Sequence, residues 1–165
     1  MASQSTDRAW ESESLKEEAS HIIEEARMIL PGIQALFGFQ LVAVFNQRYV
    51  QLPPIGNIVH MVSLLLITIA IALIMAPAAY HRLAEPGRAS RRLIRITSAL
   101  ICAAMVPLMF GLALDVFVVC LFMTSNESLS LCVAITLLSV FCSTWFLLPL
   151  LMRWRFRNSK IWPLD

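Results

Sequence analysis

Long apolar stretches alternate with shorter polar ones along this chain. The apolar stretches cover about 28–46, 57–79, 93–123 and 131–152. Each is close to or above the roughly 20 residues that a helix needs to cross a hydrocarbon core about 30 Å thick. In lipid each stretch must be helical, because every backbone polar group has to be bonded within its own segment. The pattern therefore predicts an all-α polytopic membrane protein with four transmembrane helices in an antiparallel bundle.

Composition favours a membrane location over a soluble bundle. Of the 165 residues, 58% are hydrophobic and only 15% are charged, and the mean hydropathy is +0.72. A domain of this size has too little interior to hide that much apolar surface from water. A soluble bundle would also need polar residues at helical spacing, yet LLLITIAIALIMA at 64–76 contains one threonine and no charge.

We expect three parts: a polar, acidic N-terminal segment at 1–27, a transmembrane domain at 28–152 and a basic, aromatic tail at 153–165. In the first part, apolar residues recur at intervals of four, three, four and three, which predicts an amphipathic helix. These residues are Leu15, Ala19, Ile22, Ala26 and Ile29. This helix either lies along the protein's own cytoplasmic surface or offers a docking surface to a partner. Pro31 and Gly32 predict a bend between it and the first span.

The distribution of basic residues predicts the orientation. Eleven of the 13 lysines and arginines lie before the first span, between the second and third spans, or after the fourth. A twelfth, Arg95, lies at the start of the third span on the same side, and only Arg48 lies on the other side. By the positive-inside rule, both termini and the 80–92 loop face the cytoplasm of a multi-pass protein. In the tail, Arg153, Arg155 and Arg157 alternate with aromatic residues. This alternation predicts an interfacial anchor that contacts lipid headgroups, including anionic ones.

Polar side chains inside the spans or next to them are candidates for structural or functional contacts. Asp115 is the only ionisable residue well inside a span, and Arg48 and His60 are the basic groups that the topology places on its side. We expect one of them to pair with it, either to fix the packing or to form an ion or proton site. Gln34 and Gln40 lie about 240° apart on a helical wheel, so we expect separate interhelical hydrogen bonds.

Small residues lead up to the aspartate on the third span. Ala103, Pro107 and Gly111 precede Asp115 at intervals of four. Small residues let helices approach closely, so we expect this face to pack against protein rather than lipid.

A second polar group lies at the predicted cytoplasmic interface. Tyr80, His81 and Arg82 directly follow the second span, and Glu24 and Glu25 precede the first. We expect these residues to lie close together, as a salt-bridged cluster or as a proton relay.

The four cysteines show no metal-binding spacing, and we expect no metal and no cofactor. Cys120 and Cys132 flank the hairpin TSNESLS symmetrically. A disulfide between them and free buried thiols are both compatible with the sequence.

Two segments resemble the DUF6328 family, an uncharacterised bacterial multi-span membrane family (domain of unknown function). They are EEARMILPGIQALFGFQLVAVFN at 24–46 and APAAYHRL at 76–83. The resemblance implies a small protein of the bacterial inner (plasma) membrane and implies no activity. The motif positions that the resemblance highlights are Leu30, Pro31, Gly32, Gln34, Phe37, Phe39, Pro77, Tyr80, His81 and Arg82.

The chemistry of the chain does not favour an enzyme. Its three histidines, at 21, 60 and 81, are scattered, and it has no phosphate-binding glycine loop. The arginines already lie where the positive-inside rule requires them, which argues against nucleic-acid binding. We therefore expect a non-enzymatic helix bundle that self-associates as a homo-oligomer or serves as an accessory or assembly component of a membrane complex. The alternative is a small oligomeric channel or transporter with Asp115 as an ion or proton site.

Overall fold

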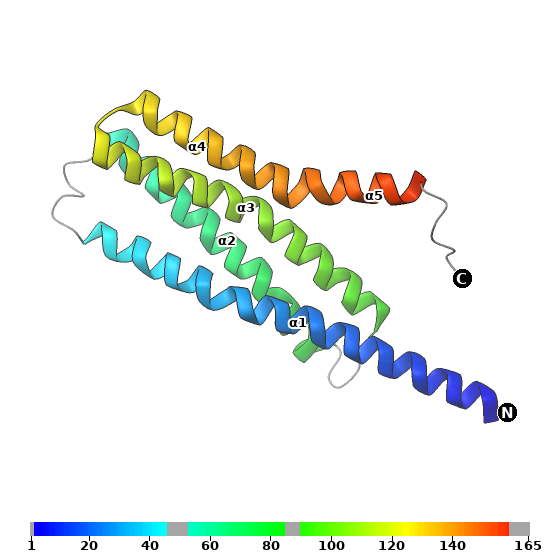
Figure 1. Cartoon of the computed structure of the whole chain (residues 1–165). Coiled ribbons are helices and arrows are strands. Elements are labelled where there is room, and N and C mark those ends of the chain that lie inside the picture. The colour runs from blue at the N-terminus through cyan, green and yellow to red at the C-terminus, as the bar shows by residue number, and fades with distance from the viewer. Residues whose placement is uncertain (1, 46–52, 85–89, 159–165) are drawn as a thin grey trace. The chain divides into compact units, whose positions relative to one another are not determined.

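The computed structural model describes residues 2–45, 53–84 and 90–158, and within these ranges the chain is helical with no strand. The elements run in the order α1, α2, α3, α4, the π-helix η2 and α5 (Figure 1). Their bounds are Ala2–Val44, Pro54–Ala84, Arg91–Thr124, Glu127–Cys142, Ser143–Leu147 and Leu148–Asn158. The prediction of an all-α chain built on four long apolar helices is confirmed.

Four stretches of the described helices are long and apolar enough to cross a bilayer: Ser20–Val44, Pro54–Leu83, Arg91–Thr124 and Glu127–Arg155. Each predicted span coincides with one of these four stretches. Only the last two residues of the first predicted span fall outside, and at every other end the helical stretch is longer than the predicted span. The reason is that a helix continues beyond the hydrocarbon region wherever its backbone bonds can still close.

The first span is continuous with the polar segment that precedes it. α1 is a single helix with Pro31 inside it, so no break separates the predicted amphipathic helix from the span. A proline removes one backbone bond, but neighbouring turns keep theirs. Of the predicted apolar face, Ile22 and Ala26 are half-buried and Ile29 is exposed. The side chains of Leu15 and Ala19 lie outside the described part of the chain.

The chain divides into two compact units that share α2 and α3. The first consists of Met1–Gln51 and Leu64–Leu108. Its buried side chains come from α1, α2 and α3 and recur along each helix mainly at intervals of three, four or seven, which is the spacing of helix packing. They include Ile33 and Gln40 of α1, Ile67, Ala70 and Ile74 of α2, and Leu93, Thr97 and Ala104 of α3.

The second unit consists of Leu52–Ser63 and Met109–Asp165. A turn of only two residues joins α3 to α4. Ser125 adopts a left-handed φ of 51°, and its N–H donates to the Leu121 carbonyl at 2.8 Å, which closes the end of α3. The Asn126 side chain then accepts from the Leu129 N–H at 3.0 Å and caps α4. So short a connection makes α3 and α4 antiparallel neighbours.

The fourth span changes its winding before Pro149. In η2 the chain forms a π-helical turn, and the Leu148 N–H bonds to the carbonyl of Ser143, five residues earlier. Because Pro149 has no N–H and its ring crowds the carbonyl four residues earlier, a wider turn relieves that contact. The local irregularity expected of a proline is thus a π-helical turn here.

Candidate functional site

The candidate site begins with the first turns of α2. Pro54 occupies the first helical position, where its missing N–H removes no helix bond, and the Gly56 N–H donates to the Pro53 carbonyl at 2.8 Å. From this start, Gly56, His60 and Ser63 follow at intervals of four and three, and all three are buried. The helix therefore presents an imidazole and a hydroxyl on one packed face.

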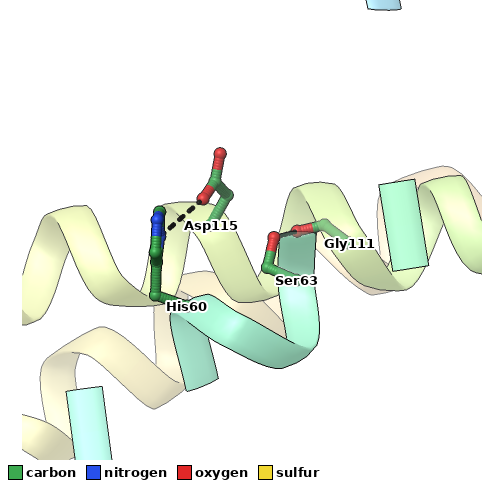
Figure 2. Close-up of polar contacts among 4 residues, drawn as sticks. All are labelled: His60, Ser63, Gly111 and Asp115. Atoms are coloured by element: carbon green, nitrogen blue, oxygen red, sulfur yellow. Dashed lines mark hydrogen bonds and ion pairs between the residues drawn. The ribbon is translucent and has the colours of Figure 1, made fainter. Parts of the chain in front are cut away.

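The second half of α3 supplies the opposing groups. The Ser63 Oγ donates a hydrogen bond to the backbone carbonyl of Gly111 at 2.8 Å. One turn along, His60 lies beside Asp115 (Figure 2). Residue numbers rise along α2 while they fall along α3, so the two segments are antiparallel. With hydrogen in place of a side chain, Gly111 lets the α2 hydroxyl reach the α3 backbone.

The distance from His60 Nδ1 to Asp115 Oδ1 is 3.6 Å. This is too long for a hydrogen bond, so the interaction is electrostatic and requires a protonated imidazole. The His60 side chain is 5% exposed and that of Asp115 is 17% exposed.

The structure thus brings together two of the three residues predicted for this cluster. His60 is within ion-pair distance of Asp115, whereas Arg48 lies outside the described residues. The face of small residues is only partly as expected. Gly111 is buried, but Pro107 is half-buried and Ala103 is exposed. The expectation for Ala103 is wrong because steps of four advance 40° per step around a helix, so residues 12 apart no longer share a face.

The two glutamines of α1 have different surroundings. Gln40 is buried, whereas Gln34 is exposed. Gln34 makes no hydrogen bond to another described residue, so its predicted interhelical bond is not present in the part of the chain that the structure describes. Their separation on the helical wheel explains why packing against one side of α1 buries only one of them.

The predicted cytoplasmic cluster is not assembled by ion pairs. Glu24, Glu25 and Arg82 are exposed and Tyr80 and His81 are half-buried. No ion pair joins any two of these five residues in the part of the chain that the structure describes. The Nδ1 atom of His81 is buried and has no hydrogen-bond partner in the described chain. Charged side chains near a helix end gain little from pairing when water already solvates them, and these groups remain open to it.

The cysteines are free thiols. Cys102, Cys132 and Cys142 are exposed and Cys120 is half-buried. Of the two alternatives for Cys120 and Cys132, the structure therefore has the unbridged one. In the part of the chain that the structure describes, no three His, Cys, Asp or Glu side chains converge in a way that holds a metal ion.

Sequence reasoning missed Ser63, although a signal for it exists. Ser63 lies three residues after His60, so both fall on one face of α2. Asn57, three residues before His60, has a buried Oδ1 without a hydrogen-bond partner in the described chain. A polar side chain one turn from an intramembrane titratable residue is therefore a useful indicator of a polar cluster.

The comparisons with known proteins concern almost the whole chain. Residues 4–149 match the model of a family described as a family of unknown function. The chain belongs to the DUF6328 family. This confirms the resemblance noted in its N-terminal half. No curated protein and no solved structure matches the DUF6328 chain significantly.

Proposed function

We propose that this DUF6328 protein is a non-enzymatic helix bundle of the bacterial inner membrane that self-associates, as a homo-oligomer or as an accessory component of a membrane complex. The observation that carries the proposal is the uneven burial of the four candidate spans. In the single chain, 39% of the apolar window of α3 is buried, against 11% for α1 and 6% for the span that starts with α4. Two apolar helices therefore offer most of their surface to lipid or to other protein.

The distribution of basic residues supports a topology with both termini in the cytoplasm. A reporter that is active only in the cytoplasm should work when fused after Asp165 or inserted near Gly87, and should be silent when inserted at Asn126. Activity at Asn126 with silence at Gly87 would reverse the orientation.

The end of the fourth span supports contact with lipid headgroups. Arg153 and Arg155 of α5 are exposed, and so is Trp154 between them. Basic side chains next to an exposed indole suit the boundary between headgroups and acyl chains. The arginines lie where the positive-inside rule requires them, so we propose no nucleic-acid partner.

Counting copies in a bilayer tests self-association. The fluorescently labelled protein, reconstituted at decreasing protein-to-lipid ratios, should bleach in two or more steps per particle even at high dilution. A single bleaching step per particle at every protein-to-lipid ratio, as random occupancy predicts, would refute the proposed self-association. An unrelated four-span monomer handled in the same way sets the random background.

A second candidate function is a small oligomeric channel or transporter, and the His60–Asp115 pair is the observation in its favour. Two titratable groups on facing helices, one of them 17% exposed, can exchange a proton or bind a small cation. The described titratable side chains that share their unit are Glu127, the three cysteines Cys120, Cys132 and Cys142, and the exposed Arg153 and Arg155. A pH-driven or cation flux in proteoliposomes that Asp115→Asn abolishes would favour this function over a purely structural one.

A further inference from the structure

One strip of exposed residues along α1 has its own regular spacing, beside other exposed residues such as Met28, Ala35 and Phe39. Here we call it the open face. Its residues recur at intervals of three and four along nearly five turns, and all are exposed except Gly38, which is half-exposed. They are Glu24, Arg27, Pro31, Gln34, Gly38 and Leu41. The packed residues of the same helix follow a separate stripe: Ala26, Leu30, Ile33, Phe37 and Gln40. Such a spacing is that of a helix paired along its length with a second helix.

Gln34 gives the open face a requirement that lipid cannot meet. It lies seven residues past Arg27, the last charged residue before the apolar stretch, which is about 10 Å along the helix axis. From that depth its short side chain does not reach the headgroups. An amide has two N–H donors and a carbonyl acceptor, and leaving them unbonded in hydrocarbon is unfavourable. Gln34 has no hydrogen-bond partner among the described residues, and its exposed amide is accessible to a second protein chain.

The other weakly buried helix, α4, has no such requirement. The exposed hydroxyls of Thr136 and Ser139 in α4 and of Ser143 at the start of η2 each donate to the carbonyl four residues earlier, at 2.8, 2.8 and 2.7 Å. The polar groups on that side are already satisfied and can face acyl chains. Of the two helices that the chain leaves open, α1 is therefore the one that needs a protein neighbour.

We infer that the open face of α1 pairs with the open face of α1 in a second copy of this chain, in a parallel dimer. The inference rests on the proposed self-association and names its surface. Copies inserted with one orientation present Gln34 at equal depth, and a two-fold axis along the membrane normal sets the two amides opposite each other. An amide is complementary to itself, because each supplies the donor that the other accepts.

Two further features of the open face fit a second copy. Glu24 and Arg27 are exposed, carry opposite charges, lie one turn apart and form no ion pair in the described chain. In a parallel pair, each arginine approaches the glutamate of the other copy, which gives two ion pairs where the helices leave the membrane. At Gly38 an added Cβ would meet no atom within 4 Å. The chain's own packing does not require glycine there, whereas close approach of a second backbone does.

Cysteine crosslinking in membranes tests the surface. In a background with Cys102, Cys120, Cys132 and Cys142 replaced by serine, Gly38→Cys should give a disulfide-linked dimer on mild oxidation. The matched control is Phe39→Cys, which is next in sequence at nearly the same depth but lies about 100° around the helix. Equal crosslinking of both variants, or of neither, would overturn the inference.

Dissociation measurements separate the amide contact from the close approach. Gln34→Leu should raise the dissociation constant of the dimer roughly three- to thirtyfold. Gly38→Leu should weaken the dimer strongly, while Phe39→Leu should leave it unchanged. Because a Cβ at Gly38 meets no atom within 4 Å, Gly38→Ala, which adds only that atom, should leave the monomer at least as stable to thermal unfolding as the wild type.

The outcomes also distinguish this surface from self-association itself. If bleaching still counts two or more copies but Gly38→Cys does not crosslink and Gln34→Leu has no effect, the protein self-associates through another face and the inference is wrong. If a variant that retains Cys142, the last residue of α4, as its only cysteine forms the disulfide-linked dimer instead, the copies associate through the fourth span. Single copies at every dilution would remove the proposed self-association as well.

Discussion

The pairing of His60 with Asp115 predicts a measurable energetic coupling between α2 and α3. Asp115→Asn leaves a buried imidazole without its acid, and His60→Gln leaves the carboxylate without its counter-charge. In each single variant the remaining group stays in a low-dielectric environment without its partner, which is unfavourable. The double variant removes both groups, so its stability loss should be smaller than the sum of the two single losses.

The geometry sets the size of this coupling. Two unit charges 3.6 Å apart attract by about 4–5 kcal/mol at an effective dielectric constant near 20. Desolvation of both groups offsets much of this attraction, and Asp115 is still 17% exposed. We therefore expect a coupling free energy of about 1–3 kcal/mol, within the range found for contacting residues.

Equilibrium unfolding in mixed micelles measures this coupling, with wild type, two single variants and the double variant under identical conditions. The control cycle combines His60→Gln with Glu127→Gln, because Glu127 belongs to the same unit but is exposed at the start of α4. That cycle should be additive within about 0.5 kcal/mol. Additivity in the His60–Asp115 cycle as well would refute the pairing. Arg48→Gln with Asp115→Asn is the second cycle to run, and a larger coupling there would assign the aspartate to the arginine.

Three further predictions concern α3 and its neighbours, and each is read from unfolding free energies in micelles. Ser63→Ala should destabilise by about 1 kcal/mol, because it removes the hydrogen bond to the Gly111 carbonyl; no loss would mean that the bond contributes nothing. Ser125→Gly should stabilise by about 0.5–1 kcal/mol, since glycine tolerates the positive φ; a loss would show that the serine side chain matters more than its backbone strain. Gly111→Leu should destabilise far more than Val119→Leu, because Gly111 is buried and Val119 is 54% exposed; equal effects would contradict the close approach of α2 and α3.

The number and the helical nature of the apolar spans follow from the sequence by itself. The apolar stretches are long enough to span a bilayer, and a polar backbone in lipid has no alternative to a helix there. The family resemblance was likewise visible in local segments, and the match over residues 4–149 confirms it. Hydropathy and motif signals are properties of neighbouring residues, so they can be read without knowing which helix lies next to which.

The contacts of the candidate site depended on the tertiary structure. Ser63 and Gly111 are 48 residues apart in sequence, and their hydrogen bond exists only for one rotation and one register of α2 against α3. In the packed structure Gly111 is buried and Ala103 is exposed, although both belong to the predicted face of small residues. The register of α2 against α3 also brought His60 within 3.6 Å of Asp115. Likewise, only packing decided that Gln40 is buried while Gln34, on the same apolar helix, is exposed. Lipid stabilises every rotation of an apolar helix almost equally, so the fit of side chains between helices, and not hydropathy, selects which polar groups meet.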